Sequence, residues 1–232
     1  MTDLDKSYIA TAVFGAISDT LDADGEITPI QYASTMPDEA AVHAATKRFT
    51  GLLHQTPPMA SAIKVGGERL YKAYRRGETI ERECRPVAVH DFKLLALKKE
   101  DNTATFTVSC SSGTYVRTLV SDLASSLGTG AYLTALRRIR IGHLSLQDAS
   151  KLDELTTHTL LKRIIHPKEL VSHLPAVEVS GEERSLVCNG RLFRAFGAEG
   201  SRYRVEAGGE LLAIYRDREG GVSRAEVVLC AG

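Results

Sequence analysis

The chain lacks the features that define several large classes of protein. Its 29 lysine and arginine residues balance 29 aspartate and glutamate residues, so net charge alone is not expected to hold a nucleic acid. Its apolar runs are too short to cross a membrane, and the first ten residues, MTDLDKSYIA, do not have the layout of a secretion signal. We therefore expect a soluble, cytoplasmic protein.

Cysteine is also scarce, and the common catalytic motifs are missing. The four cysteines, at positions 84, 110, 188 and 230, include no C-x-x-C pair, which argues against a zinc site and predicts reduced thiols. The sequence contains no G-x-S-x-G, no phosphate-binding loop, no dinucleotide fingerprint and no H-E-x-x-H. The dispersed histidines give no metal-binding spacing, so we expect no metal.

One acidic stretch, TLDADGE, resembles the middle of a calcium-binding EF-hand loop. In that register the first ligand would be Thr20 and the twelfth would be Gln31. Neither residue supplies the carboxylate that these positions require. The stretch is therefore predicted to be an acidic turn.

The chain of 232 residues, 43% of them hydrophobic, is long enough for a large domain and a smaller one. Alternation predicts strands from Asp5 onward and within 87–97 and 103–110, and helices are predicted over 37–49, near 68–76 and from about 115 to 127. From about residue 175, short alternating runs accompany one helix, for which Ser180 and Glu183 predict a capping box. We predict an α+β fold with a mixed, largely antiparallel sheet over 1–173, and a small β-rich domain over 174–232.

The stretch CSSGTYVRT raises the question of why a cation stands at a helix start. Arg117 falls in the first turn of the helix, which Ser112 or Thr114 is expected to cap, and there the helix dipole disfavours a positive charge. One interpretation is an exposed arginine paired with a nearby carboxylate such as Asp122. The other is an anion site, with Gly113 allowing close approach and Tyr115 offering a flat face. The residues alone leave both open.

Basic residues cluster twice. Between 64 and 85, seven cations alternate with four acids and with Tyr71 and Tyr74, and a second cluster comprises Arg137, Arg138 and Arg140. A solvated charged surface is one interpretation. The other is an RNA-binding surface, in which cations contact phosphates and aromatic rings stack on unpaired bases.

Four segments, in order, resemble the bacterial tRNA pseudouridine synthase B family: DKSYIATAVFGAISDTLDADGEI, FTGLLHQTPPMASAIKVGGERLYKAYRRGE, RPVAVHDFKLL and CSSGTYVRTLVSDLASSLGTGAYLTALRR. The resemblance covers about 5–138, and the tail resembles the family's small PUA-like RNA-binding domain. It implies a pseudouridine synthase fold and isomerisation of the uridine at position 55 in the T arm of tRNA. It also implies a monomer that needs no cofactor.

The resemblance assigns roles to individual residues. Arg117 would pair with the catalytic aspartate, Tyr115 would line the uracil pocket, Leu136 would contact the base, and Tyr8 would pack on the target ring and serve the proton step at carbon 5. An extruded base held between flat and apolar groups needs such side chains. The candidate RNA-binding residues are Lys64, Arg69, Tyr71, Arg75, Arg76, Arg137 and Arg138.

Two positions depart from the family pattern. Ala60 stands where the family has a tyrosine in P-P-x-Y-S-A. The family's nucleophilic aspartate lies in G-x-L-D-x-x-A-x-G upstream of D-K-x-Y, and no aspartate of this chain has that context. We therefore expect the numbered chain to lack the nucleophile and Arg117 to lack its carboxylate; the alternative function is a non-catalytic RNA-binding protein.

Overall fold

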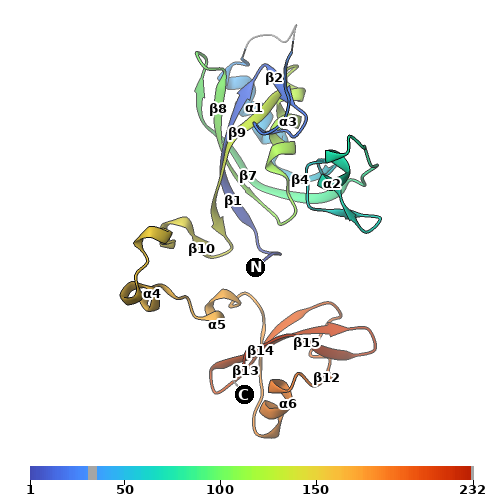
Figure 1. The fold of residues 1–232 in the computed structure, drawn as a ribbon, viewed down its shortest axis with the longest axis vertical. Coiled ribbons are helices and arrows are strands. Elements are labelled where there is room, and N and C mark those ends of the chain that lie inside the picture. Colours follow the sequence, from blue (N-terminus) through green and yellow to red (C-terminus); the bar gives the residue numbers. More distant parts are fainter. Residues whose placement is uncertain (31–35, 231–232) are drawn as a thin grey trace. The chain divides into compact units, whose positions relative to one another are not determined.

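The structure is a computed structural model that describes residues 1–30 and 36–230. The chain forms two compact units, Met1–Ala149 and Ser150–Gly232, which are described one at a time (Figure 1). The functional division predicted between residues 173 and 174 lies inside the second compact unit, and it stays a prediction. Within the described residues, no helix has both the length and the apolar character needed to cross a membrane.

The first unit is built on a six-stranded sheet with the strand order β10-β9-β1-β8-β7-β4. Each neighbouring pair in this sheet is antiparallel, as predicted. The strands are β1 (Lys6–Phe14), β4 (Gly51–Gln55), β7 (Arg85–Lys98), β8 (Thr103–Cys110), β9 (Ala131–Ile141) and β10 (Leu144–Ser145).

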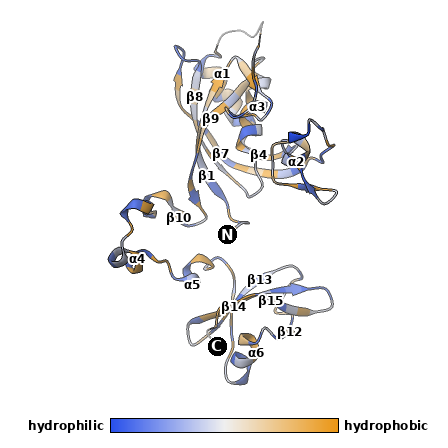
Figure 2. Cartoon of the chain, viewed as in Figure 1, coloured by the Kyte–Doolittle hydropathy of each residue, from blue (hydrophilic) through white to orange (hydrophobic). Residues whose placement is uncertain are grey.

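Two helices, α1 (Glu39–Arg48) and α3 (Val116–Ser126), pack on one face of this sheet. Alternation in β8 selects that face: Phe106 and Val108 are fully buried, whereas Thr105 and Thr107 point the other way and are half-buried. Figure 2 shows the same mixture of apolar and polar residues along the strands. The two faces of the sheet are therefore chemically different, an apolar core face and a hydroxyl-rich back face.

Short elements connect these strands and helices. The predicted short helix forms as α2 (Leu70–Arg75). Two small hairpins lie outside the six-stranded sheet: one pairs β2 (Ala16–Ser18) with β3 (Ile27–Pro29), and the other pairs β5 (Lys64–Val65) with β6 (Glu68–Arg69). A 3₁₀ turn, η1 (Leu146–Asp148), follows β10.

The second unit is β-rich, as predicted. Its five-stranded sheet has the order β11-β13-β14-β15-β12, with one parallel pair, β11 and β13. Its elements are η2 (Leu152–Glu154), α4 (Thr157–Arg163), α5 (Pro167–Leu170), β11 (Ala176–Glu178), α6 (Glu182–Cys188), β12 (Phe193–Arg194), β13 (Arg202–Ala207), β14 (Glu210–Arg218) and β15 (Val222–Val228).

Two sequence-based expectations for this unit are wrong. Helix α6 begins after Gly181, whose φ of 56° suits glycine, and no side chain caps it. The capping box is therefore absent, and Ser180 contributes its carbonyl oxygen to the amide of Glu183 instead. Cys188 and Cys230 are not reduced thiols but form a disulfide, because the fold brings the end of α6 beside the end of β15.

Candidate functional site

Arg117, in the first turn of α3, is the centre of the candidate site. Its Nη1 lies 2.6 Å from Oδ2 of Asp22 and 3.1 Å from the carbonyl oxygen of Thr20. Its Nη2 donates to the carbonyl oxygen of Ala60 at 2.9 Å. Asp22 therefore offsets the unfavourable charge at this helix start. The expectation that Arg117 lacks a carboxylate is wrong, and Asp122 is not its partner.

The acidic turn is what brings Asp22 to this position. The amide of Leu133, in β9, donates to the carbonyl oxygen of Leu21 at 3.0 Å, which ties the turn to the edge of the sheet. Leu21 has a φ of 64°, a conformation that costs a branched side chain energy. The turn is thus held by tertiary contacts rather than by local preference.

Asp22 is stabilised as an anion. Burial raises the pKa of this carboxyl, but hydrogen bonds from the hydroxyl of Thr20, the amide of Asp24 and Arg117 outweigh burial and bring the pKa below its usual range. The described residues include no group of metal-ligating side chains, and Gln31 lies outside them. In this structure the carboxylate of the acidic turn accepts a hydrogen bond from Arg117.

Arg117 retains hydrogen-bonding capacity. A guanidinium has five N–H donors, and three contacts to oxygen atoms engage it here. Two donors therefore remain for a second carboxylate or for a substrate oxygen.

Gln55, a residue that the sequence analysis did not single out, fixes the start of α3. Its Oε1 accepts from the amide of Tyr115 at 2.9 Å, and its Nε2 donates to the carbonyl oxygen of Tyr115 at 3.3 Å. Neither Ser112 nor Thr114 caps the helix, contrary to expectation, since Tyr115 is the N-cap residue and no side chain of the helix start caps it. A glutamine at the end of a strand carries no local signal for this role, because its partner is 60 residues away.

A cavity of about 420 Å³ adjoins the ion pair. Arg117 and Leu136, two of the predicted site residues, both line it, and the other lining residues are Asp22, Ala23, Asp24, Leu133, Thr134 and Ala135. Leu136 is 45% exposed, which leaves its side chain available to a ligand.

Tyr8 and Tyr115 are not among the residues that line this cavity. Tyr8 lies on the same face of the sheet as Leu136. Leu136 pairs with Ala10, and the side chains of Tyr8 and Ala10, two residues apart in β1, point to one face. Burial and the nearby Cys110 raise the pKa of Tyr8, against the opposing effect of Arg138. The phenol is therefore neutral at physiological pH.

The predicted basic residues separate into distinct groups. Lys64, Arg69 and Tyr71 line one cavity of about 510 Å³ at the β5–β6 hairpin. The guanidinium of Arg75 lies 5.5 Å from the ring centre of Tyr71. Arg76, in contrast, lies 2.7 Å from carboxylate oxygens of both Glu68 and Glu78, so its charge is already neutralised.

Arg137 and Arg138 lie on opposite faces of the sheet. Arg138 pairs with Tyr8 on the core face, and Arg137 pairs with Ile9 on the back face. The second basic cluster of the sequence is thus not one surface.

The fold is that of pseudouridine synthases. A solved Cbf5–Nop10–Gar1 complex matches 99% of this chain and 67% of the solved chain, with a TM-score of 0.67 at 20% identity. A solved H/ACA ribonucleoprotein bound to a substrate RNA matches 99% of this chain and 67% of the other, with a TM-score of 0.65 at 18% identity. At such identities the likeness defines the fold alone.

Sequence comparison defines the family. The model of the TruB family pseudouridylate synthase N-terminal domain matches residues 1–116, and that of the tRNA pseudouridylate synthase B C-terminal domain matches residues 117–178. The chain therefore belongs to the TruB family of tRNA pseudouridine synthases, which are isomerases.

Curated relatives agree with this assignment. The tRNA pseudouridine synthase B of Thermobifida fusca is 37% identical over 98% of this chain and 78% of its own length. That of Mycobacterium tuberculosis is 37% identical over 99% and 76%, and that of Burkholderia pseudomallei is 38% identical over 99% and 78%.

Proposed function

We propose that this chain binds the T arm of tRNA and forms the pocket in which the uridine at position 55 is isomerised. The observation that carries the proposal is the cavity in which the partly buried Arg117–Asp22 ion pair faces the exposed side chain of Leu136. A charged group beside an apolar group suits a flipped uracil, which has polar edges and an apolar face. The PUA-like domain predicted over 174–232 would supply a further contact with the RNA.

The reaction exchanges one bond of the base for another. The bond from ribose carbon 1 to uracil nitrogen 1 breaks, the detached ring rotates, carbon 5 bonds to the ribose and its proton is removed, while nitrogen 1 gains a proton. Tyr8 lies on the same sheet face as Leu136 and is the candidate for the proton step at carbon 5. Because its phenol is neutral, it can take up the carbon-5 proton only as its own hydroxyl proton leaves, to solvent or to nitrogen 1. Tyr115 lines the uracil pocket in this proposal, and Leu136 contacts the base.

We assign Asp22 an orienting role rather than the role of nucleophile. Its carboxylate already accepts from Thr20, Asp24 and Arg117, and these bonds stabilise the anion and lower its nucleophilicity. The family's motif for the attacking aspartate, G-x-L-D-x-x-A-x-G, does not occur in residues 1–232. The two remaining donors of Arg117 would bind that attacking carboxylate. The RNA-binding alternative follows if no such carboxylate reaches the site.

Release of tritium from carbon-5-labelled uridine in tRNA tests this assignment. The 232-residue chain is expected to release none, because orientation of a nucleophile supplies roughly 7 to 11 kcal/mol of catalysis and pocket residues alone do not replace it. A chain to which the family's motif G-x-L-D-x-x-A-x-G is joined upstream of residue 1 is expected to release tritium, and replacement of the aspartate of that motif should abolish release.

Release by the 232-residue chain itself would contradict the assignment. In that case Asp22→Asn is the first variant to examine: release that persists would exclude Asp22 as the attacking group, and Asp19 and Asp24 would be the next residues to replace. Binding of tRNA by every chain, with release by none, would favour the non-catalytic alternative.

The two neighbouring arginines of α2 offer a matched test of RNA binding. Arg75 has no carboxylate partner among the described residues, whereas two carboxylates neutralise Arg76. Replacing Arg75 by Gln should reduce the steepness of the salt dependence of tRNA binding by roughly 0.7 to 0.9, the contribution of one phosphate contact. The Arg76→Gln variant should change it little; equal effects would show that the ion pairs of Arg76 open on binding.

A further inference from the structure

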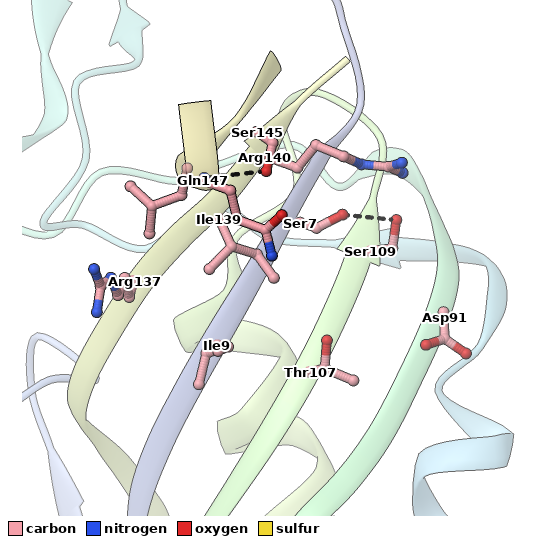
Figure 3. A pocket seen from close by; sticks show the side chains of 11 residues that line it. Ser7, Ile9, Asp91, Thr107, Ser109, Arg137, Ile139, Arg140, Ser145 and Gln147 are labelled. Carbon is pink, nitrogen blue, oxygen red and sulfur yellow. Dashed lines mark hydrogen bonds between the residues drawn. The ribbon is translucent and has the colours of Figure 1, made fainter. Parts of the chain in front are cut away.

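A second cavity, of about 690 Å³, lies on the back face of the six-stranded sheet (Figure 3). Its lining includes Ser7 and Ile9 of β1, which alternate with Tyr8 and Ala10 on the core face. Alternation therefore separates this cavity from the candidate uridine site by the thickness of the sheet. We call this cavity the groove. Its other lining residues are Asp91, Thr107, Ser109, Arg137, Ile139, Arg140, Ser145, Leu146 and Gln147.

A β-bulge gives the groove its second cation. Ser7 pairs with Arg140 and Tyr8 pairs with Arg138, so Ile139 is an extra residue in β9. Without the bulge, Arg137 and Arg140 would point to opposite faces, because they are an odd number of residues apart. With it, both line the groove.

The two arginines have no acidic partner within the part of the chain that the structure describes. The groove contains one carboxylate, Asp91, which already forms an ion pair with Lys93 at 2.7 Å. The groove is therefore locally cationic, although the formal net charge of the whole chain is zero. Such an excess favours an anionic ligand.

The floor of the groove suits a ribose–phosphate chain. The hydroxyls of Ser7 and Ser109 lie 3.3 Å apart on neighbouring strands, and Thr107 lies beside them in the groove. Hydroxyl groups donate to phosphate oxygens and to ribose, and a 2′-hydroxyl can accept and donate in return. Ile9 and Ile139 add an apolar surface against which a sugar or base can pack.

The positions of the arginines favour an extended ligand over a single phosphate group. In Figure 3, Arg140 extends across β1 towards Ser109, whereas Arg137 lies on the outer side of β9. We propose that a strand of RNA crosses this groove, with Arg137 and Arg140 binding different phosphates of its backbone. The groove would be a second RNA contact of the first unit, Met1–Ala149, on the sheet face opposite the uridine pocket. This inference rests on the RNA-binding part of the proposed function.

Methyl NMR of the full 232-residue chain separates the two proposals. An RNA hairpin with the sequence of a T arm is titrated into protein labelled at isoleucine and leucine methyls. Ile9 and Ile139 report on the groove, and Leu133 and Leu136 report on the uridine pocket. Shifts at both pairs support the inference. Shifts at the leucines alone overturn it while sparing the proposed function, and shifts at neither pair overturn both.

Charge-neutralising variants test the assigned contacts. In the Arg137→Gln/Arg140→Gln protein, binding of the hairpin should depend on salt less steeply by about 1.4 to 1.8, the contribution of two phosphate contacts. Arg163→Gln is the matched control, because Arg163 is exposed and has no partner among the described residues. An effect no larger than that of the control overturns the proposal. A titration with uridine monophosphate is the second control. The proposal is also overturned if this nucleotide shifts the Ile9 and Ile139 methyl signals as strongly as the hairpin does at equal concentration.

Discussion

The two faces of the six-stranded sheet are made by the same strands but hold their charged groups differently. On the core face, Arg117 is fixed by oxygen atoms of Thr20, Asp22 and Ala60 before any ligand arrives. On the back face, Arg140 has hydroxyl neighbours and no carboxylate partner within the described residues. The arginine of the core face is therefore held in one position by the protein itself, whereas the arginine of the back face is not paired with a carboxylate among the described residues.

The largest expected effect is on packing, and it compares adjacent residues of β8. Phe106 is fully buried and packs on Phe92, so Phe106→Ala should lower the free energy of unfolding by roughly 3 to 5 kcal/mol. Thr107→Ala, on the back face, should change it by no more than about 0.5 kcal/mol. Urea unfolding measures both, and similar losses for the two variants would show that the back face is also covered.

A smaller effect is expected from the amide that fixes the start of α3. Gln55→Ala leaves the amide and the carbonyl oxygen of Tyr115 without their partner, which should cost about 1 to 3 kcal/mol. Hydrogen exchange at the Tyr115 amide should also accelerate, a local sign that a general loss of packing would not produce. The control is Gln147→Ala in the groove, whose side chain is exposed and whose loss should leave stability unchanged. Unaltered exchange at Tyr115 would contradict the role assigned to Gln55.

The sequence predicted the elements well because their signals are local. The alternation of β8 and the apolar spacing of α3 are both visible in short windows, and both elements form as expected. The contacts that build the site are not local: Asp22 and Arg117 are 95 residues apart, and Gln55 reaches across 60 residues. The bulge at Ile139 is equally invisible, because it depends on the register between two strands.

The resemblance to a family compensated for part of this deficit. It selected Arg117 and Leu136, which line one cavity, although the residues alone left Arg117 with two interpretations. It did not reveal Asp22, because the family motif for the catalytic aspartate lies upstream of D-K-x-Y and carries no information about the acidic turn. The sequence predicts the acidic turn, but only the fold shows that Arg117 is its partner.

The smallest effect is the pH dependence of the ion pair on the core face. The side chains of Arg117 and Asp22 are 23% and 25% exposed, so the pair should contribute roughly 1 kcal/mol, the upper end for pairs near a surface. The folded protein lowers the pKa of Asp22, so this contribution is present above the unfolded-state pKa of about 4. It is lost as the pH falls through the lower pKa of the folded state.

The measurement is the free energy of unfolding of the parent chain and of Asp22→Asn between pH 7 and pH 3. The parent should be the more stable at pH 5 to 7, and its advantage should shrink steadily below about pH 4 as Asp22 becomes protonated. Arg140→Gln, the matched change on the back face, should show the same pH dependence as the parent, because no carboxylate pairs with Arg140 among the described residues. A constant difference between parent and Asp22→Asn down to pH 3 would mean that the hydrogen bonds of Asp22 stabilise the fold without its charge. The contrast between a preorganised face and an open one would then have to rest on geometry alone.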